Sequence, residues 1–234
     1  MSGILEGVKV VDMGHVVAIP AAGAMLGDWG AQVTKVEPLS GDMLRGLRRP
    51  DNGEVNWGFQ VLNRNKKGLA LDLKQEPGRD ILYKLVQRTD VFMSNYELST
   101  LKKLKADYAK LSQVNPKLIY ALLTGYGTVG PDKDERGFDY SAAWARSGMQ
   151  YLIGEPGSPP PPQRGGMMDR VAAAHTIAGI LAALLHREKT GRGQELEFSL
   201  YHMGVWLLAT DIQSALVGSP LPKHDRTQPR NPIW

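Results

Sequence analysis

The sequence of 234 residues contains no cysteine, which excludes a disulfide framework, a thiol nucleophile and any zinc site built on thiolates. An excess of one charge is also lacking, because 28 Lys and Arg against 24 Asp and Glu leave a net charge of only +4. This charge is too dilute to predict a nucleic-acid-binding protein, although it would suit a phosphorylated small molecule. The basic residues stand in short groups such as Arg64, Lys66 and Lys67, for which solvated surface positions are the simplest interpretation.

Long apolar runs are missing as well. Residues 1–10 hold no apolar secretory core, and the longest nearly apolar run, residues 171–185, is interrupted by His175 and Thr176. A run of this length is too short to cross a bilayer. We therefore expect a cytoplasmic protein without a membrane partner.

What the sequence does contain is an alternation of short apolar runs with helix-like segments. Six runs are predicted strands, at residues 8–12, 32–37, 69–73, 91–94, 118–123 and 195–200. Pro20 and Pro77 suit the starts of two helices between them. This alternation predicts an α/β fold, a Rossmann-like parallel sheet with helices on both faces. No Gly-x-Gly-x-x-Gly follows the first strand, which weakens the case for a standard dinucleotide site.

Proline marks two irregular segments. Residues 155–166, EPGSPPPPQRGG, predict a loop, because proline lacks the N–H donor that a helix interior or central strand requires. Residues 218–234 lose periodicity and carry four prolines, as a linker would. We therefore expect one domain over residues 1–217 and the start of a linker toward a missing smaller domain over residues 218–234.

Asp169 is the strongest candidate for chemistry. It precedes a small-residue helix, and because Asp is a preferred N-cap, a structural role alone would explain it. A helix N-terminus also holds a carboxylate ionised and oriented, ready to attack an electrophile. The local sequence leaves both roles open, and they are compatible.

Other candidates follow from the sheet, because ligands of parallel sheets bind beyond the carboxyl ends of the strands. His15 follows the first strand and would suit a substrate carboxylate, with a structural histidine as an equal alternative. The remaining histidines show no metal-ligand spacing, and neither a GxSxG elbow nor a P-loop is present in the sequence. The sequence therefore gives no indication of a metal.

Several segments together carry a family resemblance. They are LEGVKVVDMGHVVAIPAAGAMLGDWGAQVTKVEP from Leu5, NRNKKGLALDLK from Asn63, DVFMSNY from Asp90, NPKLIYALLTGYGTVGP from Asn115, MMD from Met167 and HREKTGRGQ from His186. In this order they resemble the family III CoA transferases, which include formyl-CoA and carnitine CoA transferases. Each motif alone is weak, but the set spans essentially the whole chain.

The resemblance implies an activity and a set of site residues. Asp169 corresponds to the family's catalytic aspartate, which attacks an acyl-CoA thioester to give a mixed anhydride and then an enzyme-bound CoA thioester. The implied substrates are an acyl-CoA and a small carboxylic acid. The implied coenzyme contacts are Val17, Ala18, Leu71, Asp72, Leu73, Lys74, Asn95, Tyr96, Lys103, Arg136, Gly137, Phe138 and Asp139.

Two departures from the family pattern qualify this interpretation. Pro38 stands where some members carry an arginine for the coenzyme, and Arg45 is a candidate substitute. Phe138 stands where the similar α-methylacyl-CoA racemases have the histidine of a Gly-His-Asp sequence. Racemisation needs an acid and a base on opposite faces of the substrate carbon, so a racemase is the minor alternative.

A further alternative belongs to a different class: a CoA-binding module, or an inactive truncated fragment. Members of the family are substantially longer than this chain and are dimers whose two chains interlock. We therefore expect an interlocked homodimer for the full-length protein. Binding without turnover would distinguish a module from an enzyme.

Overall fold

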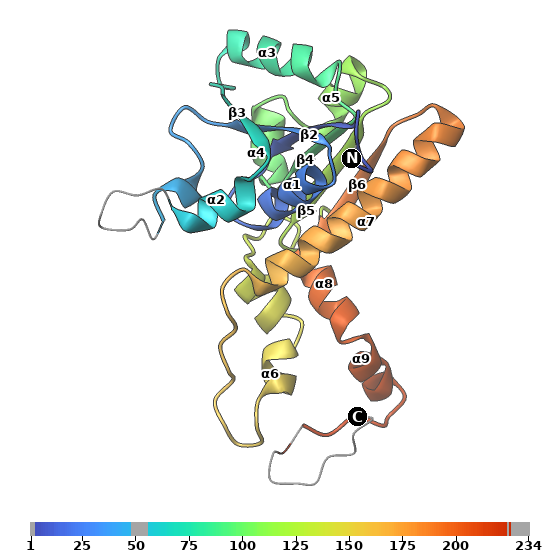
Figure 1. Ribbon diagram of the computed structural model, residues 1–234. Coiled ribbons are helices and arrows are strands. Elements are labelled where there is room, and N and C mark those ends of the chain that lie inside the picture. The colour runs from blue at the N-terminus through green and yellow to red at the C-terminus, as the bar shows by residue number, and fades with distance from the viewer. Residues whose placement is uncertain (1–2, 48–55, 224, 226–234) are drawn as a thin grey trace. The chain divides into compact units, whose positions relative to one another are not determined.

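The computed structural model describes residues 3–47, 56–223 and 225, and its centre is one six-stranded sheet in the order β3-β2-β1-β4-β5-β6 (Figure 1). The strands are β1 Lys9–Met13, β2 Gln32–Glu37, β3 Lys66–Ala70, β4 Val91–Ser94, β5 Ile119–Thr124 and β6 Gln194–Ser199. The pairings of β1 through β5 are all parallel. β6 begins beside the start of β5, where Gln194 N–H donates to the carbonyl of Leu118. The predicted parallel α/β fold is confirmed.

Helices lie between the strands along the chain, and two more follow β6. They are α1 Ala18–Asp28, α2 Trp57–Asn63, α3 Glu76–Val86, α4 Leu98–Lys103, α5 Tyr108–Val114, α6 Met149–Ile153, α7 Met167–Thr190, α8 Leu200–Leu207 and α9 Ala209–Leu216, with a 3-10 turn η1 Met43–Arg45 and a π-helical segment η2 Asp139–Ala145. Side chains alternate between faces along a strand. Val11 and Met13 of β1 accordingly join a core with α3, α4 and α5, whereas α1 packs against β1 and β2 from the other side.

The chain divides into two compact units, and each is described by itself. Unit 1 comprises residues 1–124 and 169–198, and unit 2 comprises residues 125–168 and 199–234. The predicted boundary at residue 217 stays a prediction. α9 ends at Leu216, and residues 224 and 226–234 of the predicted linker lie outside the described residues.

The third strand differs from its prediction. β3 runs over Lys66–Ala70 instead of residues 69–73, with Lys66 paired to Val33 and Ala70 to Glu37. Its first residues are lysines, which hid the strand in the sequence. Residues 71–74 therefore follow the strand at the carboxyl edge of the sheet.

α7 is longer than the apolar run suggested. It has 24 residues, and by length and composition alone it could cross a membrane. A core helix passes the same test, and α7 makes a close contact with the sheet: a Cβ on Gly179 would lie 2.5 Å from Cζ of Phe198 in β6. Near the C-terminal end of α7, Arg187 forms an ion pair with Asp90 at 2.9 Å. Gly179 thus allows α7 to lie close against β6.

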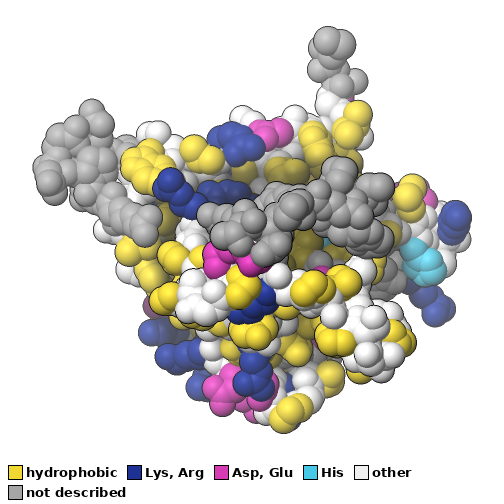
Figure 2. Space-filling view, turned by 90° about the horizontal axis from the view of Figure 1, so that it is seen from below, with side chains coloured by type: hydrophobic (Ala, Val, Ile, Leu, Met, Phe, Trp, Pro, Cys, Tyr) yellow, Lys and Arg dark blue, Asp and Glu magenta, His cyan; other side chains and the backbone are white. Residues whose placement is uncertain are grey.

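Surface charge follows the composition. On the face shown in Figure 2, Lys and Arg side chains stand among hydrophobic and neutral ones and are not gathered into one patch. This distribution agrees with the net charge of +4.

Candidate functional site

The turn from β1 to α1 has an unusual backbone. Val16 has a φ of 61°, in the left-handed region that β-branched residues rarely adopt. α1 then begins without a side-chain cap, and the carbonyl of Val17 accepts from Ala21 N–H at 2.8 Å. Val17 is half-buried and Ala18 is buried. The two predicted contacts Val17 and Ala18 therefore stand directly after a strained residue, as is common at functional sites.

Side chains from three other segments bind the main chain of this turn. Lys35 Nζ donates to the carbonyl of Gly14 at 2.9 Å. His15 N–H donates to Oδ1 of Asn95 at 2.9 Å, and Nδ2 of Asn95 donates back to the carbonyl of His15 at 3.0 Å. Val16 N–H donates to Asp42 at 3.3 Å. The conformation of the turn is thus determined by residues distant in sequence.

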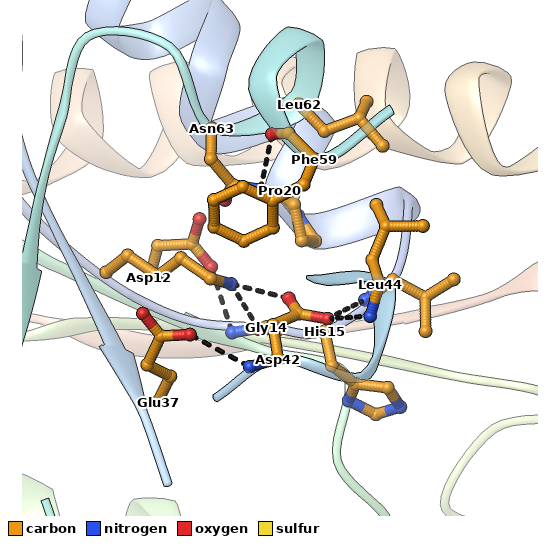
Figure 3. A network of polar contacts seen from close by, with 12 residues as sticks. Asp12, Gly14, His15, Pro20, Glu37, Asp42, Leu44, Phe59, Leu62 and Asn63 are labelled. Atoms are coloured by element: carbon orange, nitrogen blue, oxygen red, sulfur yellow. Dashed lines mark hydrogen bonds and ion pairs between the residues drawn. The ribbon is translucent and has the colours of Figure 1, made fainter. Parts of the chain in front are cut away.

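Two buried ion pairs support these contacts. Lys35 and Asp42 lie 2.8 Å apart, and Lys66 and Asp12 lie 2.6 Å apart, with no side chain more than 2% exposed. Figure 3 shows the carboxylate of Asp42 in the middle of this network. Lys66 also donates to the carbonyls of Pro20 and Leu62, each at 2.7 Å. The solvated position predicted for Lys66 is therefore wrong, because Asp12 and these carbonyls compensate for its burial.

Burial and pairing shift the pKa values of this network. Burial lowers the pKa of Lys66, and the opposing effect of Asp12 does not restore it. Burial alone would raise the pKa of Asp42, but Lys35 and the backbone donors reverse the sign and leave that pKa below its usual value. The carboxylate of Asp42 is therefore held as the charged partner of Lys35 in a dry environment.

Arg45 lies beside the network but is already engaged. Its Nε and Nη2 donate to the carboxylate of Glu37 at 2.9 and 2.6 Å, and its guanidinium lies 3.9 Å from the ring centroid of Phe59. Burial would raise the pKa of Glu37, but the hydrogen bonds from Arg45 and from Asp42 N–H lower it below its usual value. That Arg45 replaces the arginine missing at Pro38 stays a prediction.

A cavity of about 440 Å³ opens at this carboxyl edge. Its surface is mostly apolar, as in sites for small organic ligands. The lining residues are Met13, Val36, Glu37, Pro38, Leu39, Ser40, Leu71, Asp72, Leu73, Lys74, Tyr96, Thr100 and Leu104. Five of the predicted coenzyme contacts, the four at 71–74 together with Tyr96, therefore meet at one cavity.

His15 does not line this cavity, but its ring packs against Tyr96, which does. The two rings have centroids 4.8 Å apart and are tilted by 55°. Among the described residues, Nδ1 of His15 is buried and has no hydrogen-bond partner. Burial lowers the pKa of His15, with Asp42 opposing and Lys35 adding to the effect, so the ring is neutral near pH 7. Asn95 reaches the site through His15, and its predicted direct contact with the coenzyme stays a prediction.

Asp169 and Lys103 complete the predicted residues of unit 1. Lys103 is the exposed last residue of α4. Asp169 lies in the first turn of α7, which begins at Met167, so it does not precede the helix as predicted. It is half-buried. Because α7 leads into the start of β6, its first turn points toward the carboxyl edge of the sheet, and the helix dipole favours a carboxylate there.

The four predicted residues at 136–139 belong to unit 2. Arg136 and Phe138 are exposed, Phe138 at 68%. A Cβ on Gly137 would lie 2.8 Å from Cα of Gly125, so the two backbones need glycine to approach this closely. Asp139 is buried, and its Oδ2 accepts from Gly166 N–H at 2.7 Å. Asp139 therefore holds the residue directly before α7, a structural role that the sequence did not indicate.

A larger cavity, of about 550 Å³, lies at the opposite, amino edge of the sheet. Four basic side chains line it, from Lys9, Lys67, Lys84 and Arg88, and none of the predicted site residues does.

Over residues 3–47 and 56–223, three or more His, Asp or Glu side chains nowhere gather as metal ligands would.

Sequence reasoning missed the network that holds the turn. A weak signal existed, because Lys35 stands inside the apolar run of β2 and a buried lysine requires a partner. The partner, Asp42, lies in the following loop, and nothing in the local pattern identified it.

Comparison with known proteins places the chain in a family. Residues 5–233 match the family described as CoA-transferase family III. The chain is 37% identical to (R)-2-hydroxy-4-methylpentanoate CoA-transferase of Clostridioides difficile, over 98% of the chain and 58% of that protein. It is 38% identical to cinnamoyl-CoA:phenyllactate CoA-transferase of Clostridium sporogenes, over 92% of the chain and 53% of that protein.

A solved structure agrees with these matches. A CAIB/BAIF family protein from Brucella suis superposes with a TM-score of 0.90 at 32% identity, over 96% of this chain and 60% of that one. The chain thus spans little more than half the length of the relatives that it matches.

Proposed function

The chain belongs to CoA-transferase family III, and from this membership we propose that it supplies the coenzyme-binding region and the nucleophile of an enzyme that moves CoA between carboxylic acids. The observation that carries the proposal is the carboxyl edge of the sheet in unit 1. An apolar cavity lined by residues 71–74 and Tyr96 opens there, and Asp169 lies in the first turn of α7, the helix that precedes β6. These are the two components that the reaction needs.

The proposed chemistry begins with the carboxylate of Asp169. One oxygen attacks the thioester carbonyl, the C–S bond breaks, and CoA leaves as a thiolate while a mixed anhydride forms. The thiolate then attacks the carbonyl of Asp169, the anhydride C–O bond breaks, and the donor acid departs. An incoming carboxylate repeats both steps in reverse and leaves as the new acyl-CoA. Each intermediate keeps the activation of the thioester, which an ester on a serine would lose.

The coenzyme-binding roles follow the geometry of each residue. In the proposal, residues 71–74 and Tyr96 form the wall for the adenosine end, and the main chain of Val17 and Ala18 also contacts the coenzyme. Lys74 and Lys103 offer charge to the phosphates, as exposed lysines do. Arg136–Asp139 of unit 2 stay predicted coenzyme contacts.

The acceptor is proposed to be a 2-hydroxy carboxylic acid. The names of three relatives contain such an acid: 2-hydroxy-4-methylpentanoate, phenyllactate and malate. All three share a hydroxyl beside the carboxylate and differ in the remaining chain. A cytoplasmic location and a homodimer of the full-length protein belong to the same proposal.

Covalent trapping tests the mechanism. The protein is incubated with a panel of acyl-CoA thioesters and then with hydroxylamine, and its peptides are analysed by mass spectrometry. The proposal expects a hydroxamate on Asp169 that appears only with a productive acyl-CoA. Asp80→Asn, which removes an exposed acid on α3, is the matched control and should label like the parent.

The alternatives give different results in the same experiment. A binding module would bind CoA and yield no hydroxamate with any thioester. A racemase would exchange the proton beside the thioester carbonyl with solvent, without a covalent adduct. Either outcome would overturn the transferase mechanism.

A further inference from the structure

We propose that Asn95 is a positioning residue, which holds the turn at residues 14–17 in its left-handed conformation so that the coenzyme meets a preformed site. The inference rests on the proposed function for its ligand. Its structural part, the clamp on the turn, stands on contacts within unit 1.

The strain in the turn needs an explanation. Val16 adopts a φ of 61°, where the branched Cβ of valine meets its own backbone. A free turn would relax to negative φ, because only glycine adopts this region readily. Such a conformation persists only where the surroundings over-determine it.

Asn95 has the geometry of a clamp. Its side-chain amide accepts from His15 N–H at 2.9 Å and donates to the carbonyl of His15 at 3.0 Å, so both polar groups of the residue before Val16 are fixed. Asn95 is itself anchored by its neighbour. Ser94 Oγ donates to the carbonyl of Met13 at 2.8 Å and accepts from Tyr96 N–H at 3.1 Å.

The clamp also connects the turn to the cavity. Tyr96 follows Asn95, lines the cavity and packs its ring against His15. Asp42 holds the other side of the turn through Val16 N–H, at the longer distance of 3.3 Å. A change at Asn95 should therefore alter both the direction in which Val17 enters α1 and the position of the cavity wall.

The role predicts a separation of kinetic parameters. Without the clamp, the competent turn becomes a minor conformation, and apparent affinity falls by the fraction that remains competent. Asn95→Ala should weaken CoA binding by about 10-fold, which is the expected loss for two hydrogen bonds to neutral groups. The value of kcat at saturating acyl-CoA should change little, because Asn95 does not touch the reacting atoms.

The decisive experiment is a double-mutant cycle with Val16→Gly. Glycine adopts positive φ without steric strain, so the clamp has less to hold in that background. Asn95→Ala should therefore weaken CoA binding by only about 3-fold when residue 16 is glycine, against about 10-fold in the parent. A merely structural role for Asn95 would give the same factor in both backgrounds and would overturn the proposal.

A second measurement does not depend on the ligand. Amide hydrogen exchange of residues 14–17 should be fastest in Asn95→Ala and slowest in the parent. Asn95→Asp, which keeps the acceptor for His15 N–H, should lie between them. Should the alanine variant not fold, the aspartate variant carries the same comparison with the parent. If the parent does not bind CoA, the proposed function is wrong. The clamp is judged separately, because unchanged hydrogen-exchange rates of residues 14–17 in the variants would overturn it.

Discussion

The two edges of the sheet in unit 1 differ in a way that cavity size does not reveal. The amino edge has the larger cavity, about 550 Å³, lined by exposed lysines and Arg88. The carboxyl edge has the smaller one, about 440 Å³, and beside it lie two buried ion pairs and a strained valine. Buried charge and backbone strain both reduce stability, so they persist mainly where function requires them. They therefore indicate a functional site better than the volume of a cavity does.

The difference has a structural origin. In a parallel sheet, every strand ends at the carboxyl edge and the chain turns there into a helix, whose N-terminal N–H groups face the same space. The turn at residues 14–17 and the first turn of α7 both belong to this edge. The amino edge receives helix C-termini, such as that of α3, and their charges remain in solvent.

The largest expected effect is the loss of CoA transfer in Asp169→Asn. The amide cannot attack a thioester, so the transfer rate should fall by at least about 1,000-fold, as it does when other enzymes lose a nucleophile. CoA binding should stay within about 2-fold, because the cavity is not altered. Steady-state exchange assays and calorimetry measure the two quantities, with Asp80→Asn as the matched surface control. Normal turnover in the asparagine variant would remove Asp169 from the mechanism.

Two adjacent lysines of β3, one in the buried network and one at the amino-edge cavity, should contribute differently to the free energy of unfolding. Lys66→Met leaves the buried carboxylate of Asp12 unpaired, which should lower the free energy of unfolding by about 3–5 kcal/mol. Lys67→Met changes an exposed residue that lines the amino-edge cavity, and it should change that free energy by less than about 0.5 kcal/mol. Urea unfolding of both variants gives the comparison. Equal effects would show that the buried pair contributes nothing special.

These lysines also show how far the sequence could lead. The strands at 32–37 and 91–94 were predicted to the residue, because their apolar composition is a local property. β3 was misplaced since its first residues are lysines, and Lys66 is buried only because Asp12 lies 54 positions earlier in the chain. Burial of that kind depends on the tertiary fold, which no local pattern encodes.

The site was predictable to a similar degree. The family resemblance implied residues 71–74 and Tyr96 as coenzyme contacts, and the structure brings them to one cavity. The contacts of Asn95 with His15 and of Asp139 with Gly166 were not predictable, because a side chain that binds main chain leaves no pattern in the sequence. In both cases the residue type was chosen for its hydrogen bonds, and the partner was visible only after folding.

A smaller effect compares one lysine from each cavity. Lys74 lines the carboxyl-edge cavity, and Lys74→Ala should weaken CoA binding by about 5-fold through loss of a partly solvated contact with phosphate. Lys84 lines the amino-edge cavity, and Lys84→Ala should change binding by less than about 2-fold. Titration calorimetry at two salt concentrations measures both, and the effect at Lys74 should shrink at high salt. A larger loss of CoA affinity in Lys84→Ala than in Lys74→Ala would place the coenzyme at the amino edge instead of the carboxyl edge.

The smallest expected effect is a change in the pH dependence of stability at His15. Burial lowers the pKa of this ring below 6.5, while Asp42 and Glu97 oppose the shift and Lys35 adds to it. Below pH 6.5 the unfolded chain therefore binds a proton that the folded chain does not bind, so stability falls as the pH drops toward the folded pKa.

His15→Phe, which keeps a ring against Tyr96, should lose this part of the acid dependence. His186→Phe, at an exposed histidine of α7, is the matched control for replacing a histidine by phenylalanine. Urea midpoints measured between pH 5 and 8 on the three proteins decide the matter, because an unchanged slope in His15→Phe would mean that the ring takes up its proton in the folded protein as readily as in the unfolded one.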